Sequence, residues 1–205
     1  TPGRIFGDVV DTVIRQATCE MVLVKLGKTP ESIINHQRPF LTHLFPIPPL
    51  SHSPSHYLPI APSPHLPLPP PQFNSWLVPM AGGPNARAAI KLLPALVTLG
   101  NDPKIRLTRV FKPSESEPDM KILEEAIRIL VRRQKSSSTV VAAPVQADSV
   151  TEGVINLVKT EHYDVVVLGA SREGMLQQAI KGNIPEAIAS GVDSTVILVR
   201  GAINN

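Results

Sequence analysis

The sequence predicts an α/β fold in which helices cover both faces of a parallel sheet. Two aliphatic runs, 164–168 (DVVVL) and 195–199 (TVILV), are typical of strands that are buried on both faces. Segments with apolar residues at helical spacing, such as 119–133, alternate with runs of this kind. Strands that alternate with helices favour parallel pairing, because each crossover returns the chain to the same end of the sheet.

Five strands, with helices between them, are expected after residue 74. The strands are expected at 75–80, 105–111, 139–145, 164–168 and 195–199, and helices at 86–99, 119–133 and about 149–160. The second of these helices has apolar residues on one face, which predicts that this face packs on the sheet: Met120, Leu123, Ile127, Leu130 and Val131. Ser149 and Glu152 form a capping-box pattern, which predicts a helix start at that point.

A proline-rich segment precedes this domain. From about residue 38 to 72 the composition shifts to stretches such as FPIPPLSHSPSHYLPIAPSPHLPLPPP, in which proline removes backbone donors and fixes φ. We therefore interpret residues 26–73 as a linker. Five of the six histidines lie in or beside it without a repeated spacing, so no metal site is expected: His36, His43, His52, His56 and His65. A partner that recognises proline-rich peptides is an alternative use of this segment.

The overall composition narrows the class of function. No run of about 18 apolar residues could cross a bilayer, and the N-terminal TPGRIFGDVV lacks the layout of a secretory signal. The single cysteine, Cys19, cannot form an internal disulfide, which favours a reducing compartment. A formal net charge of +3 with 4% aromatic residues does not indicate a nucleic-acid partner. We therefore expect a cytoplasmic location.

The N-terminal residues match a later segment of the same chain. Gly7 to Lys25 (GDVVDTVIRQATCEMVLVK) aligns without a gap on Gly182 to Arg200 (GNIPEAIASGVDSTVILVR), at an offset of 175 residues. Both segments contain a glycine, a capping Asp or Asn, an acidic residue three places later, a short helix, an aliphatic strand and a terminal base. We interpret residues 1–25 as the end of a first copy whose beginning is missing from this chain.

Residues 74–202 resemble a universal stress protein domain, which implies a five-stranded parallel α/β fold of the adenine nucleotide alpha hydrolase-like type. In nucleotide-binding members the loop after the fourth strand reads glycine, two residues, glycine, nine residues, glycine, then serine or threonine. Here Gly169 and Gly182 match that pattern, whereas Arg172 and Asn183 replace the second glycine and the hydroxyl residue. The resemblance implies a remnant of a first unit at 1–25, a linker at 26–73 and a complete domain at 74–205.

A narrower resemblance concerns the arrangement of the units. Two such units joined by a proline-rich linker, with the stretches FNSWLVPMAGGPNARAAIKLLPAL and VVLGASREGMLQQAIKGNIPEAIA, are similar to the cytoplasmic tails of cyanobacterial chloride-channel-type transporters. This resemblance implies that the chain belongs to a larger membrane transporter and lies at the cytoplasmic face of the membrane.

A nucleotide site is expected, if there is one, beyond the carboxyl ends of the strands. Ser171 and Arg172 could bind a phosphate, and a helix that begins at Asn183 favours an anion through its free N–H groups. Against this, the Arg172 side chain fills a position that the motif leaves bare, and Ala81 follows the first strand where binding members carry an aspartate. In the first copy Asp8 would repel a phosphate. The candidate residues are Ala81, Gly82, Gly169, Ser171, Arg172, Gly174, Gly182 and Asn183.

The sequence indicates a regulatory module rather than an enzyme. It contains no HExxH, Walker A lysine or GxSxG pattern, and His162 is expected at the surface. We expect a non-enzymatic regulatory or sensor domain, with ATP or AMP binding as the alternative. In the universal stress protein family units pair through the last strand. The resemblance therefore implies that the strand from Thr195 to Val199 pairs with the one from Glu20 to Val24, within one chain or between chains, which would also cover an exposed sheet edge.

Overall fold

The computed structural model describes residues 8–28, 73–115, 119–133, 139–170 and 184–202. Residues 1–27 and 72–205 belong to one compact unit, and every element below lies in it. The five linker histidines, and the candidate site residues Ser171, Arg172, Gly174, Gly182 and Asn183, lie outside the described residues.

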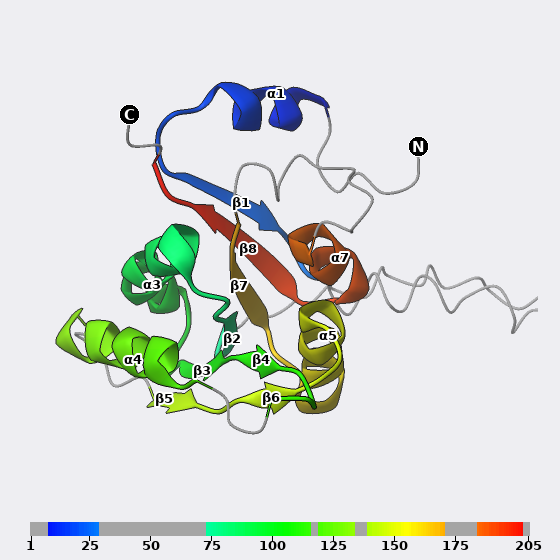
Figure 1. The fold of residues 1–205 in the computed structure, drawn as a ribbon. Helices are drawn as coiled ribbons and strands as arrows, with labels where there is room; N and C mark the ends of the chain where they lie inside the picture. The colour runs from blue at the N-terminus through cyan, green and yellow to red at the C-terminus, as the bar shows by residue number, and fades with distance from the viewer. Residues whose placement is uncertain (1–7, 29–72, 116–118, 134–138, 171–183, 203–205) are drawn as a thin grey trace, which may run out of the picture. The chain divides into compact units, whose positions relative to one another are not determined.

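The described residues form a main sheet of six strands in the order β1-β8-β7-β2-β3-β5 (Figure 1). These strands are β1 (Met21–Lys25), β2 (Ser75–Pro79), β3 (Lys104–Thr108), β5 (Thr139–Ala142), β7 (Val165–Gly169) and β8 (Thr195–Arg200). The five strands from β8 to β5 are mutually parallel, which confirms the predicted fold class. Strand β1 adds a sixth strand, antiparallel to β8.

Helices cover both faces of this sheet. One face carries α3 (Gly83–Leu96), which continues as a short 3-10 turn (Val97–Leu99), and α4 (Lys121–Arg133). The other face carries α1 (Asp8–Gln16), α5 (Val150–Glu161) and α7 (Ile184–Gly191). The alternation along β7 shows the two layers, because Val165 and Val167 face the first core and Val166 faces the second.

The helix starts and buried faces follow from the sequence. In α4 the buried side chains are Leu123, Ala126 and Leu130. The prediction was wrong for Val131, which is 64% exposed because it lies next to Leu130 along the helix and so turns away from the buried face. Helix α5 begins as predicted, because the Ser149 side chain accepts a hydrogen bond of 3.1 Å from the Glu152 N–H.

Two of the predicted strands, 105–111 and 139–145, are each divided in the structure. After β3 the chain leaves the main sheet at Arg109 and forms β4 (Val110–Phe111), which pairs with β6 (Val145–Gln146) in a separate parallel sheet. Between β5 and β6 the N–H bonds to the neighbouring segment continue, from Ala143 to the Leu107 carbonyl at 3.0 Å and from Val145 to the Arg109 carbonyl at 2.9 Å, so the interruption lies on the acceptor side. The Ala143 carbonyl instead accepts a hydrogen bond of 2.8 Å from the Thr108 hydroxyl. Each predicted strand therefore contributes one strand to the main sheet and one to the second sheet.

Candidate functional site

The carboxyl ends of β2 and β7 lie side by side, and there the structure places the described candidate residues Ala81, Gly82 and Gly169. Gly82 has φ +88° and ψ −179°, a backbone conformation that is essentially limited to glycine. Gly83 follows with φ +83° and opens α3, with Pro84 in the first turn. The glycine pair is therefore needed to turn the chain from β2 into α3.

Gly169 has a packing role that the sequence motif did not reveal. A Cβ atom at this position would lie 2.7 Å from backbone atoms of Asn85 and Ala86, so the first turn of α3 rests directly on the end of β7. The Asn85 side chain accepts a hydrogen bond of 3.1 Å from the Gly201 N–H, which ties the same turn to the end of β8. A motif glycine that the resemblance assigned to a phosphate loop is thus required by the fold itself.

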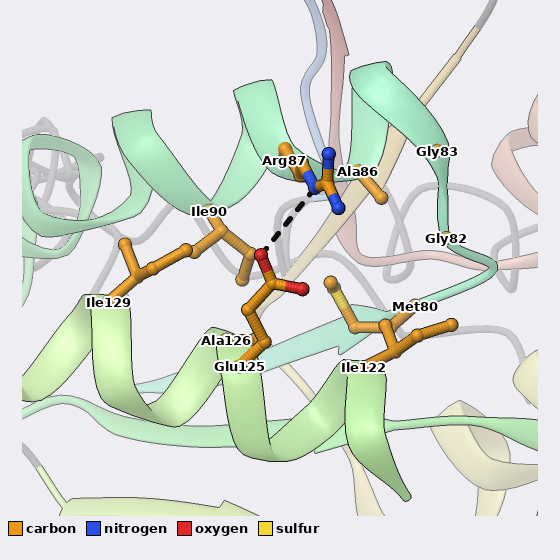
Figure 2. Close-up of a pocket in the computed structure, with 10 residues that line it drawn as sticks. All are labelled: Met80, Gly82, Gly83, Ala86, Arg87, Ile90, Ile122, Glu125, Ala126 and Ile129. Carbon is orange, nitrogen blue, oxygen red and sulfur yellow. Dashed lines mark ion pairs between the residues drawn. The ribbon is translucent and has the colours of Figure 1, made fainter. Parts of the chain in front are cut away.

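A cavity of about 210 Å³ lies between α3 and α4 (Figure 2). Its apolar lining comes from Met80, Ala86, Ile90, Ile122, Ala126 and Ile129. Its charged side chains, Arg87 and Glu125, face each other across the opening with Nε and Oε1 3.6 Å apart, and both are exposed. The cavity is smaller than the roughly 300 Å³ of ordinary ligand pockets and offers little that could bind a phosphate.

Strand β1 and β8 form an interface with internal symmetry. Leu23 lies opposite Leu198, and these two residues are also matched by the 175-residue offset of the sequence alignment. The pairs on either side, Val22 with Val199 and Val24 with Ile197, therefore exchange under a local twofold axis through the Leu23–Leu198 pair. Helices α1 and α7, which precede the two strands, pack on the same face of the sheet.

Each of the two strands ends in a base that contacts the helix segment preceding the other strand. Arg200 is buried, and its guanidinium donates hydrogen bonds to the carbonyls of Ile14 at 3.4 Å, Ala17 at 2.9 Å and Cys19 at 3.0 Å. Lys25 donates a hydrogen bond of 2.7 Å to the Val192 carbonyl, just beyond α7.

These contacts are symmetric as well. Lys25 matches Arg200 and Ala17 matches Val192 at the same offset of 175. A cation near the C-terminal end of a helix is favoured by the exposed carbonyls and the helix dipole. A base at the end of both segments is visible in the sequence, but no role was predicted for it. The occurrence of the two bases at matched positions is the signal that could have indicated this capping role.

A second polar cluster links β3 to the end of α5. The Tyr163 hydroxyl donates a hydrogen bond of 2.6 Å to Glu161, whose other carboxylate oxygen accepts one from Arg106. Burial, together with the bond to Glu161, raises the pKa of Tyr163 to about 12, whereas the hydrogen bonds from Arg106 and Tyr163 lower the pKa of Glu161. Burial acts to lower the pKa of Arg106, but its bonds to Glu161 and Tyr163 outweigh that effect and raise it. The three side chains hydrogen-bond to one another, while the buried Arg106 Nε has no hydrogen-bond partner among the described residues.

Neither a metal centre nor a membrane span is found in the described part of the chain. None of its His, Cys, Asp and Glu side chains form a group of three or more that could hold a metal ion. His162 is exposed, as predicted, and ends α5 with φ +54°. Over the same residues, no helix has the length and apolar character that crossing a bilayer requires.

No family model and no curated protein matches this sequence. Its fold, however, is similar to solved structures. A universal stress protein in complex with cAMP matches with a TM-score of 0.51 and 17% identity, over 61% of this chain and 94% of that one. One from Archaeoglobus fulgidus DSM 4304 matches with a TM-score of 0.50 and 14% identity, over 63% of this chain and 45% of that one. Another from Archaeoglobus fulgidus matches with a TM-score of 0.50 and 10% identity, over 62% of this chain and 94% of that one. The protein therefore has the universal stress protein fold.

Proposed function

We propose that this chain is a non-enzymatic regulatory module of the universal stress protein type, which acts through the pairing of two units. The observation that carries the proposal is the antiparallel pairing of β1 with β8 about a local twofold axis, with reciprocal caps from Arg200 and Lys25. Residues 1–25 then belong to one unit and 74–205 to the other. The linker at 26–73 transmits a change in their pairing to a membrane transporter on the cytoplasmic side.

The α1–β1 segment is attached weakly enough to serve as a movable joint. Among its described side chains only Ile14 and Met21 are buried, whereas every residue of β8 is buried. Elements that bury little apolar surface open locally at a lower free energy than the whole domain. The segment can therefore separate from β8 while the five parallel strands stay folded.

Native-state hydrogen exchange tests this proposal. We expect the β1 amides to exchange through an opening of lower free energy and lower denaturant dependence than the β7 amides, which exchange through global unfolding. A matched control joins the two strands by a disulfide between Leu23→Cys and Leu198→Cys in a Cys19→Ser background, which should abolish the separate opening. If β1 and β7 exchange with the same free energy and denaturant dependence, β1 is a permanent part of the domain and the pairing does not regulate.

The second candidate function is adenine nucleotide binding. Gly82 and Gly83 leave backbone free of side chains at the carboxyl end of β2, and a universal stress protein of similar fold was solved in complex with cAMP. The apolar Met80 and Ala81, in place of the aspartate of binding members, speak against it. We therefore place this function second.

Calorimetric titration with ATP, ADP, AMP and cAMP separates the two candidates. We expect no binding by the unmodified chain and measurable binding by the Arg172→Gly variant, because the substitution removes the side chain from a position that nucleotide-binding loops leave bare. Binding by the unmodified chain that weakens in the variant would instead make Arg172 a phosphate ligand. Thermal unfolding gives an independent readout, since a ligand at a hundredfold excess over its Kd stabilises the folded state by about 2.7 kcal/mol.

A further inference from the structure

Strand β1 is an edge strand, and apolar side chains are exposed on it and on the neighbouring residues of the N-terminal segment. Among the side chains that the structure describes in residues 8–28, large apolar ones are exposed at Val13, Val22, Val24 and Leu26, with exposed fractions of 50%, 43%, 49% and 73%. Val22 and Val24 lie on one face of β1, and Val13 lies on α1. Figure 1 shows β1 as the outermost strand of the main sheet, on the side away from β5.

The local twofold axis identifies what covers the corresponding positions in the second half of the chain. Val22 and Val24 match Ile197 and Val199, which are 4% and 0% exposed and share a core with α3. Val13 matches Ile188, which is 0% exposed and packs with α5 side chains. The same positions are therefore covered in one half of the interface and open in the other.

The same offset predicts which kind of strand would lie beside β1. On its far side from β1, β8 pairs in parallel with β7, from Val165 opposite Thr195 to Gly169 opposite Val199. Applying the offset of 175, an equivalent strand would run parallel to β1 opposite residues 20–24. It would be aliphatic, because its side chains would meet both cores, and it would end in a small residue opposite Val24.

We propose that the exposed edge of β1, with Val13, Val22 and Val24, is a docking surface for a universal-stress-protein-fold unit that lacks its own last helix and strand. This inference rests on the proposed function. The partner contributes a strand like β7 beside β1, a helix like α3 over Val22 and Val24, and a helix like α5 over Val13. The α1–β1 segment completes that unit while β8 completes the other.

A second copy of this chain fits the surface less well. In such a copy β7 and α3 are already engaged by its own β8, so neither is available to β1 of another molecule. The partner must also accommodate Leu26, which matches Gly201, whose Cα hydrogen in the second half points toward the Ala88 methyl. A Cβ at Gly201 would lie 3.5 Å from the Ala88 Cβ, which is ordinary contact, so the larger leucine needs a small adjustment of the helix.

The chain supplies its own probe. Residue 176 matches residue 1 at the offset of 175, so residues 72–175 fused directly ahead of the full chain recreate the spacing between β7 and α7. In a Cys19→Ser background, the Val24→Cys thiol is expected to react readily with a disulfide reagent in the unfused chain. In the fusion we expect its reaction to slow by at least about tenfold, because buried thiols exchange only after local opening.

Controls make each outcome decisive. A Val131→Cys thiol, placed only in the C-terminal copy of α4, should react equally in both proteins because Val131 is exposed there. In the second half of the chain, residues 72–175 fold together with α7 and β8. If the Val24→Cys reactivity in the fusion equals that in the unfused chain, and the denaturant m-value does not rise, the added residues have not packed on β1. That result overturns the docking surface. Self-association of the unfused chain that Val24→Asp abolishes would also overturn it, in favour of a second copy. The proposed function is tested separately, by hydrogen exchange of the β1 amides, so neither result of the thiol experiment decides it.

Discussion

The Arg200→Met substitution is expected to lower the free energy of unfolding by about 3 kcal/mol. Arg200 is 2% exposed, and its guanidinium donates to three carbonyls of the α1 segment, the furthest of them 186 residues away in sequence. Methionine keeps most of the volume but donates no hydrogen bond, so the carbonyls of Ile14, Ala17 and Cys19 lose their partner while they remain near the sheet. Urea denaturation of both proteins measures the difference.

The matched control is Lys25→Met at the symmetric position. Lys25 is only half-buried, and its hydrogen bond to the Val192 carbonyl lies nearer to solvent, so we expect a loss of about 1 kcal/mol or less. In hydrogen exchange, Arg200→Met should lower the opening free energies of β1 and β7 by the same amount, because its bonds to the α1 segment are broken in both openings. Equal losses for the two substitutions would contradict a special role for the buried arginine.

The Gly169→Ala substitution is expected to destabilise the protein by roughly 2–3 kcal/mol in the absence of any ligand. The added methyl group would lie 2.7 Å from the backbone of Asn85 and Ala86, and backbone at the start of a helix cannot rotate away as a side chain can. The first turn of α3 must therefore shift, which strains both its core contacts and the Asn85 bond to Gly201. Chemical denaturation measures the loss.

Gly201→Ala is the control for this second prediction. A Cβ at Gly201 would meet the Ala88 Cβ at 3.5 Å, which is ordinary van der Waals contact, so the expected change is within about 0.5 kcal/mol. The comparison also separates two roles of Gly169. A glycine kept only for close approach to a phosphate would leave the stability of the ligand-free protein nearly unchanged on substitution, and that result would refute the packing role.

The sequence was sufficient to predict the parallel sheet and its helices because those features depend on local pattern. Short aliphatic runs such as 164–168 are typical of buried strands. The cap formed by Ser149 and Glu152 acts within one helical turn. Local pattern could not predict that the 105–111 and 139–145 segments divide between two sheets. That division depends on the pairing of β4 with β6, which joins residues far apart in the chain.

Of the candidate site residues, the structure describes Ala81, Gly82 and Gly169. The glycines at 82 and 169 do lie together at the carboxyl ends of β2 and β7, as the strand order required. The motif spacing could not reveal that the α3 backbone occupies the space beside Gly169, since a glycine needed for packing and a glycine needed for a phosphate look the same in a sequence.

By itself, then, the sequence determined the alternation of strands and helices, the parallel sheet and the match between residues 7–25 and 182–200, because each is a regular spacing of residue types along the chain. Only the tertiary structure decided how that match is used. It places Leu23 opposite Leu198 on a local axis and brings the Arg200 guanidinium to the carbonyls beyond α1. Such contacts depend on closing a loop of 175 residues or more, for which no local periodicity carries information.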